Sequence, residues 1–413
     1  MSALLVFEDN KASRFLPLAW TRPVFELRCG IWTLREAIER AYSCPSSALF
    51  VRNFLTGVMR ERTGLPVNLS STDGLCLLLN GRLLADNRLP STMPMFGEPC
   101  RYVAPDGTLL GAWVEGEALL AGWGAVDALP TREIEWPLVE WPWELFHRNG
   151  ERIVQQANAW PLGERPALQG VHLLGAEDIF IHPSARVQPG VVLDTSDGPI
   201  IIDEKATVMA NAVIQGPSYV GPESSVKIGA KIYHGTTIGP LCKVGGEVEE
   251  SVFQGYSNKQ HDGFLGHAYV GEWCNFGADS NNSDLKNNYS TVSVWCDGAW
   301  CDTESLFVGL LMGDHSKTGI NSMLNTGTVV GVSCNLFGAG LPPKYVPSFS
   351  WGGMAGWSEY RLDKALETAE RVMARRNVLL TEEERELLRH IFSATAEERR
   401  SEKPRHRGGG AQR

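Results

Sequence analysis

The chain has 413 residues, of which 43% are hydrophobic and 21% are charged. This composition is typical of globular proteins, and the length allows two domains. The 38 Lys and Arg residues against 48 Asp and Glu give a formal net charge of -10, which argues against nucleic-acid binding. No apolar run approaches the roughly 20 residues of a membrane-spanning helix, and the short, soon acidic N-terminus does not resemble a signal peptide.

The nine cysteines are scattered and include no C-x-x-C pair. A chain of this length does not depend on a disulfide framework, so reduced thiols and a cytoplasmic location are expected.

Residues 1–165 are expected to form an α/β domain. Short apolar runs bounded by turn residues occur at 3–7, 48–51 and 74–79, as in strands of a sheet that is covered on both faces. A helix is predicted over 33–41, and the Pro-containing stretch 161–166 marks the predicted boundary.

Aliphatic residues then recur every six positions over the predicted second domain, 166–350. The clearest series consists of Ile202, Val208, Ile214, Val220, Val226, Ile232, Ile238 and Val244. The flanking matches are Ile181, Val187 and Leu193 before it and Phe264, Val270 and Phe276 after it. A period of six predicts a parallel β-helix, in which three short strands and three turns make one coil with the aliphatic side chains inside. A β-sandwich with coincidental spacing is the weaker alternative.

The repeat is irregular between 281 and 306, where a loop is predicted to leave the β-helix. Residues 351–395 are predicted to contain two helices, the first over 358–376 and the second beginning at Thr381, whose spacing to Glu384 matches a capping box. Residues 396–413 are charged and Gly-rich at the end and are expected to be disordered.

Polar residues outside the repeat gather between 257 and 289. His261 and Asn275 are 14 residues apart, slightly less than one coil of three hexads, so they are expected to lie near each other on adjacent coils. A histidine with an ordinary pKa of about 6.5 suits a general base, and amide side chains can hold sugar hydroxyls. On spacing alone, a surface histidine without a role remains the alternative.

The stretches 230–235, 248–249, 261–266 and 275–278 resemble the acetyltransferase half of a bifunctional family (GlmU) that combines glucosamine-1-phosphate N-acetyltransferase with N-acetylglucosamine-1-phosphate uridyltransferase. The resemblance implies a left-handed β-helix, acetyl-CoA as cosubstrate, and His261 as the base that takes a proton from the attacking amine. It further implies the following residues: Lys231, Tyr233, Phe264, Asn275, Asn288 and Tyr289 for the sugar substrate, and Ala278, Asn321 and Ser322 for acetyl-CoA.

The sequence departs from this family's pattern near the expected phosphate site. Phe264 stands in place of a Tyr, and Tyr233 in place of an Arg that would bind phosphate. Glu249 and Glu250 precede a segment where the family has lysines. These differences remove positive charge and leave the acceptor substrate open.

Over residues 1–392 the chain is more similar to a divergent branch of the family, through motifs at 16–30, 80–84, 143–146, 257–261, 313–321 and 342–351. Members of this branch look like sugar nucleotidyltransferases with a Rossmann-like α/β domain fused to a left-handed β-helix of the acyltransferase type.

Nucleotidyltransferases of this class wrap the nucleotide phosphates with a Gly-rich loop after the first strand, but residues 7–14 contain no Gly. Nucleotide binding is therefore assigned to the following residues: Arg14, Thr21, Arg22, Arg28, Arg35 and Asn80. Structural ion pairs of Arg22 and Arg28 with Glu26 and Glu36 are the alternative. Arg82 occupies the place of the usual metal-binding Asp and cannot bind Mg²⁺, which leaves Asp86 as a weak candidate.

Three interpretations of function follow. The favoured one is a transferase of nucleotide-sugar biosynthesis. It acetylates an amino-sugar 1-phosphate, or transfers a nucleotidyl group from UTP or another NTP, or does both. Mg²⁺ is expected if the N-terminal domain is active in nucleotidyl transfer. The second keeps nucleotidyl transfer alone, with the β-helix serving for trimerisation. The third is a non-catalytic, regulatory protein that binds nucleotide sugars. A homotrimer is expected, with neither a nucleic acid nor a membrane as partner.

Overall fold

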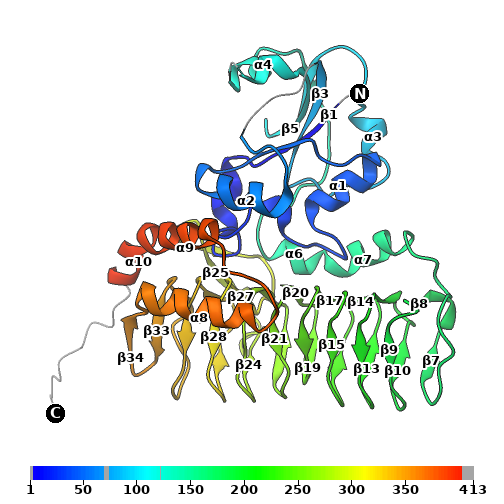
Figure 1. Ribbon diagram of the computed structural model, residues 1–413, viewed down its shortest axis with the longest axis vertical. Coiled ribbons are helices and arrows are strands. Elements are labelled where there is room, and N and C mark those ends of the chain that lie inside the picture. The colour runs from blue at the N-terminus through cyan, green and yellow to red at the C-terminus, as the bar shows by residue number, and fades with distance from the viewer. Residues whose placement is uncertain (1–2, 69–73, 121, 402–413) are drawn as a thin grey trace.

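The computed structural model describes residues 3–68, 74–120 and 122–401 (Figure 1). It consists of an N-terminal α/β domain, a left-handed parallel β-helix and C-terminal helices, as predicted. In Figure 1 the β-helix runs horizontally, with the N-terminal domain above it and helices α8, α9 and α10 at its C-terminal end.

The N-terminal domain is built on one mixed sheet of order β2-β1-β3-β5-β4-β6. Strand β1 is parallel to β2 and β3, whereas β5 is antiparallel to both β3 and β4. The strands are β1 Ala3–Phe7, β2 Ala48–Phe50, β3 Leu75–Asn80, β4 Cys100–Val103, β5 Leu109–Glu115 and β6 Thr131–Glu133. The apolar runs predicted as buried strands are β1, β2 and β3, and their central residues are almost fully buried.

The helices of this domain are α1 Leu34–Tyr42, α2 Thr56–Thr63, α3 Leu89–Thr92, α4 Gly116–Leu120, α5 Gly124–Asp127, α6 Glu144–His147 and α7 Asn149–Ala157. Helix α1 is the helix predicted over 33–41. It begins at Leu34 because the Thr33 side chain accepts a hydrogen bond from the Glu36 amide while the Glu36 carboxylate accepts one from the Thr33 amide.

Three walls of parallel strands form the β-helix, and each regular coil adds one strand to each wall. The first wall contains β7 His172–Leu174, β10 Val192–Asp194, β13 Val213–Gln215, β16 Lys231–Ile232, β19 Glu247–Glu249 and β22 Phe264–Gly266, followed by the pair β24 Asn281–Asn282 and β29 Met323–Leu324. The second contains β8 Ile179–Ile181, β11 Ile200–Ile202, β14 Ser218–Val220, β17 Thr236–Ile238, β20 Val252–Gly255, β23 Tyr269–Glu272, β27 Leu310–Met312, β30 Thr328–Val330 and β32 Tyr345–Val346. The third contains β9 Arg186–Val187, β12 Thr207–Val208, β15 Ser225–Val226, β18 Lys243–Val244, β21 Asn258–Lys259, β28 Lys317–Thr318, β31 Asn335–Leu336 and β33 Ser350–Gly353.

The hexad residues form the interior of the β-helix, because every member of the series 202–244 is at most 1% exposed. The prediction that Phe264 continues the series is wrong, since Leu265 is the residue that lies opposite Val248 inside the core. The inward residues Leu265 and Val270 are five positions apart instead of six, so the corner between β22 and β23 is one residue shorter than the regular spacing. Val270 and Phe276 are inside as predicted.

Residues at one corner of the β-helix adopt a left-handed backbone conformation coil after coil. Glu223, Leu241, Tyr256, Trp273 and His315 all have φ between 55° and 61°. Side chains other than Gly are strained there by roughly 1–2 kcal/mol each. The stacking of successive coils then places three rings in a column: those of Tyr256 and Trp273 are 4.2 Å apart and those of Trp273 and His315 are 6.3 Å apart.

The chain leaves the β-helix after β24, as predicted, and forms the hairpin of β25 Ser293–Cys296 and β26 Ala299–Asp302 before β27. The C-terminal helices are α8 Leu362–Ala374, α9 Glu382–Ala394 and α10 Ala396–Ser401. Helix α8 starts later than predicted because β34 Gly356–Glu359 pairs with β33, and α9 has the predicted capping box. The predicted disordered tail begins as α10, and its remaining residues, 402–413, lie outside the described residues.

The three units share one continuous core. The outer side of the second wall contributes Val252, Tyr269, Leu311 and Val329 to the hydrophobic cluster that also holds buried residues of the N-terminal domain and of α8 and α9. Helix α7 packs on β14 and β17, where the buried Asn149 side chain donates hydrogen bonds to the Gly235 carbonyl and the Thr237 hydroxyl. The N-terminal domain therefore packs against the side of the β-helix and is not merely joined to it by a linker.

Candidate functional site

His261 lies at a corner of the β-helix directly after β21, and it is exposed. Its backbone carbonyl accepts a hydrogen bond from Lys259 Nζ at 2.9 Å. Within residues 3–68, 74–120 and 122–401, no hydrogen bond engages its imidazole. The turn is therefore held from the inside, while the ring is available to a ligand.

Lys259 occupies an inward position, directly opposite Val244 of the preceding coil. Its side chain is buried, and Nζ donates to the Gly245 carbonyl at 3.0 Å as well as to the His261 carbonyl. Burial lowers the pKa of Lys259 to about 8, which Asp262 and Asp279 only partly oppose. An ammonium group thus replaces an aliphatic side chain beneath the His261 turn.

The predicted base and the predicted acetyl-CoA residues lie along one corner. The Asp279 amide donates to the Asp262 carbonyl at 3.1 Å, and the Asn321 amide donates to the Ala278 carbonyl at 2.8 Å. His261, Ala278 and Asn321 are therefore on three successive coils of the same corner. Ser322 follows directly, with Oγ bonded to the Gly319 carbonyl.

An exposed apolar strip continues this corner toward the C-terminal end of the β-helix. Ile320 is 71% exposed and Met354 is 66% exposed. Met323, Phe337 and Met354 line one shallow pocket on the next coils. The apolar part of an elongated ligand that lies along this corner could cover the strip while its end reaches His261.

Two of the predicted sugar-binding residues lie on the first wall beside this corner. Lys231, Glu247 and Phe264 are in register on three successive coils, which places them roughly 4.8 Å apart per step. Glu247 lies 3.5 Å from Lys231 in an ion pair and offsets its charge. The Phe264 amide donates to Asn281 Oδ1 at 2.7 Å.

The other predicted sugar-binding residues are farther from His261. Tyr233 follows β16. Asn275 pairs with Asn258 and Lys317, so it precedes the corner by three positions, or roughly 10 Å of extended chain, instead of adjoining His261. Asn288 and Tyr289 are exposed in the segment between β24 and β25, and in the described part of the chain neither makes a hydrogen bond to His261.

Arg14 and Asn80 of the predicted nucleotide site lie at the carboxyl edge of the N-terminal sheet. Asn80 Nδ2 and the Arg82 guanidinium both donate to Asp9, and Arg82 also donates to Glu140 at 2.9 Å. Burial would raise the pKa of Asp9, but Arg82 holds it below its usual value. Arg14 also pairs with Glu140, so the arginines at this edge already have carboxylate partners.

A cavity of about 610 Å³ adjoins this edge, and Glu8, Asp9, Asp106, Asp127 and Lys11 are among the residues that line it. Glu8 is bound by Arg52 and Asp9 by Arg82, so neither carboxylate is free for a cation.

The predicted metal site is not assembled. Asp86 pairs with Arg88 at 2.6 Å and lines a different cavity, between α1 and α7. Among the residues that the structure describes, no group of three or more Asp, Glu, His or Cys side chains is placed to hold a metal ion. Because Asp86, Glu8 and Asp9 each already pair with an arginine, these carboxylates do not fit Mg²⁺.

The other predicted nucleotide residues lie at the junction between the N-terminal domain and the β-helix. Thr21 Oγ1 donates to Asp314 at 2.7 Å, and Arg22 pairs with both Asp314 and Glu272. Burial alone would lower the pKa of Arg22, but these carboxylates raise it above its usual range.

Arg28 and Arg35 are engaged at the same junction. The Arg28 amide donates to the Tyr269 hydroxyl at 2.8 Å, and its guanidinium lies 3.9 Å from Glu36. Arg35 pairs with Glu26 and Glu39. The ion-pair alternative therefore holds for Arg28 with Glu36, while Arg22 has other partners than Glu26.

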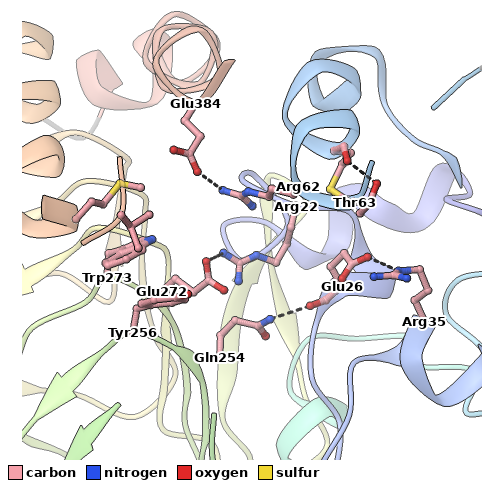
Figure 2. Close-up of a pocket in the computed structure, with 13 residues that line it drawn as sticks. Arg22, Glu26, Arg35, Arg62, Thr63, Gln254, Tyr256, Glu272, Trp273 and Glu384 are labelled. Carbon is pink, nitrogen blue, oxygen red and sulfur yellow. Dashed lines mark hydrogen bonds and ion pairs between the residues drawn. The ribbon is translucent and has the colours of Figure 1, made fainter. Parts of the chain in front are cut away.

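Arg22 and Arg35 also line a cavity of about 320 Å³ that the sequence did not predict (Figure 2). Its walls come from the N-terminal domain, the β-helix and the C-terminal helices, with Arg62, Tyr256, Trp273, Glu272 and Glu384 among the further lining residues. The only sequence signal was two aromatic residues, Tyr256 and Trp273, at corner positions where small residues are usual.

A second unpredicted group surrounds His267, which lies inside the motif that contains His261. Its Nε2 is 3.1 Å from Glu250 and its Nδ1 is 2.9 Å from Asp284. Burial alone would lower the pKa of His267, but the two carboxylates raise it to about 9. The ring stacks on Phe307 at 5.1 Å. His267 is thus a charged residue with a structural role rather than a free base.

Comparison with known proteins supports the resemblance to the bifunctional family. Residues 4–163 match the model of a family described as sugar nucleotidyl transferase. The bifunctional protein GlmU of Synechococcus sp. (strain CC9311) is 27% identical over 183 residues, which cover 43% of this chain and 34% of that protein. GlmU of Corynebacterium glutamicum (strain R) is also 27% identical, over 196 residues, 45% of this chain and 34% of that protein. The chain thus spans about a third of the length of these relatives.

Among solved structures, UDP-N-acetylglucosamine acyltransferase from Campylobacter jejuni aligns with 15% identity and a TM-score of 0.19, over 57% of this chain and all of that chain (100%). The described part of the chain contains no helix with the length and apolar character needed to cross a membrane.

Proposed function

We propose that the β-helix transfers an acetyl group from acetyl-CoA to the amine of an amino-sugar 1-phosphate, with His261 as general base. The observation that carries this proposal is the corner on which His261, Ala278 and Asn321 follow one another on successive coils, with the exposed imidazole at one end and the apolar strip at the other. The matches to bifunctional GlmU proteins supply the reaction class.

In the proposed step, the amine nitrogen attacks the thioester carbonyl carbon of acetyl-CoA while His261 accepts a proton from that nitrogen. The bond between carbon and sulfur then breaks, and the sulfur leaves as the thiol after taking up a proton. The step requires a neutral imidazole with an unengaged nitrogen, and the His261 ring is exposed and makes no hydrogen bond within the described part of the chain. Lys259 acts as a positioning residue, because its ammonium fixes the carbonyl of the same turn.

The neighbouring wall offers little positive charge for the phosphate of the proposed acceptor. Lys231 is the cation nearest to Phe264 in the row beside the corner, and Glu247 lies between them. We therefore expect weak affinity for the 1-phosphate, with the amine and hydroxyls supplying most of the recognition.

The test is release of free thiol from acetyl-CoA in the presence of glucosamine 1-phosphate. His261→Gln is expected to lower kcat about 100-fold or more, the usual contribution of a general base. His172→Gln, which replaces an exposed histidine on the first coil, serves as the matched control and should leave the rate unchanged. Thiol release by His261→Gln at the rate of the unaltered protein would refute the assignment.

Nucleotidyl transfer by the N-terminal domain is a second candidate, because the family match covers this domain and a cavity adjoins the carboxyl edge of β1. The site differs from the usual pattern of such enzymes, since Asp86 is paired with Arg88 and Arg82 is paired with Asp9 and Glu140. Pyrophosphate release from UTP and N-acetylglucosamine 1-phosphate tests it. Arg82→Met should abolish such a reaction while thiol release continues.

A further inference from the structure

Four cations without carboxylate partners gather on the third wall, beside the corner of His261. Lys227 directly follows β15, Lys243 lies in β18, and Arg375 and Arg376 directly follow α8. In the part of the chain that the structure describes, no carboxylate lies within ion-pair distance of any of the four. They therefore keep their positive charge in a protein whose 48 Asp and Glu residues outnumber its 38 Lys and Arg residues.

The register of the β-helix brings these cations together. Lys243 lies opposite Asn258 of the next coil, and Arg376 Nη2 donates to Asn258 Oδ1 at 2.9 Å. Figure 1 shows α8 lying along the β-helix, with one end near β21, the strand that contains Asn258. Burial lowers the pKa of Lys243, and the charges of its three cationic neighbours lower it further. The four groups are thus close enough to repel one another, and an anion bound among them would relieve this repulsion.

The cluster of Lys227, Lys243, Arg375 and Arg376 is set back from His261. Strands β15, β18 and β21 pair in register on successive coils, so Lys227, which follows β15, lies two coils before His261, at the corner after β21. Two coil steps are roughly 10 Å. Asn258, which holds Arg376, precedes His261 by three positions, again roughly 10 Å of extended chain.

The immediate surroundings of His261 have the opposite charge. Asp262 follows it directly, and Asp279 lies on the next coil, where its amide donates to the Asp262 carbonyl at 3.1 Å. Both aspartates are exposed, and neither forms an ion pair within the described residues. A protonated amine is attracted to this turn, whereas a phosphate beside it would be repelled. The charges therefore match an acceptor with its amine at one end and its anionic group at some distance.

The apolar strip leaves the corner in the other direction. Ile320 and Met354 belong to coils after that of His261, whereas Lys227 and Lys243 belong to coils before it. Acetyl-CoA that follows the strip carries its phosphates away from the cluster, so the acceptor is the cosubstrate that can contact it. In a 2-amino-sugar 1-phosphate only a few bonds separate the amine nitrogen from the phosphorus, and this phosphate stays near the aspartates. The second phosphate of a diphosphate extends farther, toward the cluster.

We propose that the acetyl acceptor is an amino sugar linked to a diphosphate, whose distal phosphate is bound by Lys227, Lys243 and Arg376. This assignment rests on the proposed acetyl transfer and names the substrate class of the same site. The reaction is unchanged: the amine attacks the thioester, the thiol leaves, and the diphosphate takes no part in the chemistry. The weak affinity expected for the 1-phosphate has the same cause, since a phosphate next to the sugar does not reach the cluster.

The experiment measures thiol release from acetyl-CoA with UDP-glucosamine, which contains a diphosphate, and with glucosamine 1-phosphate, which does not. We expect kcat/KM to be about tenfold or more higher for UDP-glucosamine, the value of one or more hydrogen bonds between charged groups. Lys243→Met should raise KM for UDP-glucosamine about tenfold and leave kcat, and KM for glucosamine 1-phosphate, within about twofold. Lys205→Met removes an exposed lysine of the β-helix that is paired with Glu204, and it is the matched control.

Calorimetric titration with UDP-glucosamine separates this assignment from the acetyl-transfer proposal. His261 is not part of the cluster, so His261→Gln should bind UDP-glucosamine as the unaltered protein does, and adding Lys243→Met should weaken binding about tenfold. Binding of this kind, without thiol release from the unaltered protein, would refute acetyl transfer and leave the diphosphate site intact.

Four results would overturn the diphosphate site: no binding of UDP-glucosamine, equal affinity in Lys243→Met and the unaltered protein, a kcat/KM for glucosamine 1-phosphate that equals or exceeds that for UDP-glucosamine, or a rise in KM for acetyl-CoA alone in Lys243→Met. The last result would assign the cluster to the phosphates of CoA. Circular dichroism confirms that each variant is folded.

Discussion

Lys259→Met tests whether an ammonium group is truly held inside the β-helix. Methionine keeps most of the volume of the side chain, fits an interior otherwise built from aliphatic residues such as Val244, and cannot be protonated. The substitution therefore removes the charge and its two hydrogen bonds to carbonyl groups without opening a large cavity.

The lowered pKa of Lys259 sets the size of the expected change in the free energy of unfolding. Burial takes the pKa of Lys259 from its ordinary 10.5 to about 8. Each tenfold change in acidity is worth about 1.4 kcal/mol, so the buried ammonium costs about 3 kcal/mol below pH 8 relative to an exposed one. Between pH 8 and 10.5 the unfolded chain holds this proton and the folded chain does not, so stability rises with pH over that window. From pH 7 to 9.5 the expected rise is about 2 kcal/mol.

The assay is urea unfolding followed by tryptophan fluorescence at several pH values between 7 and 9.5. The free energy of unfolding of Lys259→Met, minus that of the unaltered protein, should fall by about 2 kcal/mol across this range, because only the unaltered protein gains stability from deprotonation of Lys259. Lys364→Met replaces an exposed lysine on α8 and is the control; its difference should stay flat. A flat difference for Lys259→Met as well would refute the burial argument.

His267→Gln and Arg22→Met test two buried ionic interactions, that of His267 with two carboxylates and that of Arg22 with Asp314. The raised pKa of His267 means that its stabilisation, about 3 kcal/mol, is fully present below about pH 6.5 and is lost as the pH rises through about 9, so urea unfolding should show a large destabilisation by His267→Gln at pH 6 and little at pH 9.5. An imidazole that titrates near pH 6.5 by NMR would contradict this. Arg22→Met should cost about 3–5 kcal/mol by leaving Asp314 buried without its closest cation, and adding Asp314→Asn should recover part of the loss. A loss below 1 kcal/mol in the single variant would show that the pair is not essential.

The sequence predicted the parts of the fold that repeat. An inward side chain every six residues is a local consequence of coil geometry, so the series 202–244 was sufficient to predict the β-helix and its interior. The capping boxes at Thr33 and Thr381 are equally local, although only the second was predicted as such. Where a corner shortens, as between Leu265 and Val270, the same reasoning selected Phe264 in place of Leu265.

The candidate sites were less accessible from sequence because they depend on contacts between distant segments. Arg22 and Asp314 are 292 residues apart in the chain, and nothing local indicates that an arginine in a presumed nucleotide motif ends in a buried ion pair. The inward position of Lys259 was not predicted for another reason. A search for aliphatic periodicity does not find a lysine that occupies an aliphatic position. The cavity in Figure 2 exists only where three segments that are distant in the sequence meet.

The shared core also limits how this protein can be divided. Val252, Tyr269, Leu311 and Val329 face outward from the β-helix yet are almost completely buried, because the other two units cover them. A β-helix expressed alone would present this apolar surface to water, and an isolated N-terminal domain would expose the matching face. Exchange of one half for that of a relative would therefore have to preserve the contact surface as well as each fold, so the two halves are constrained to change together.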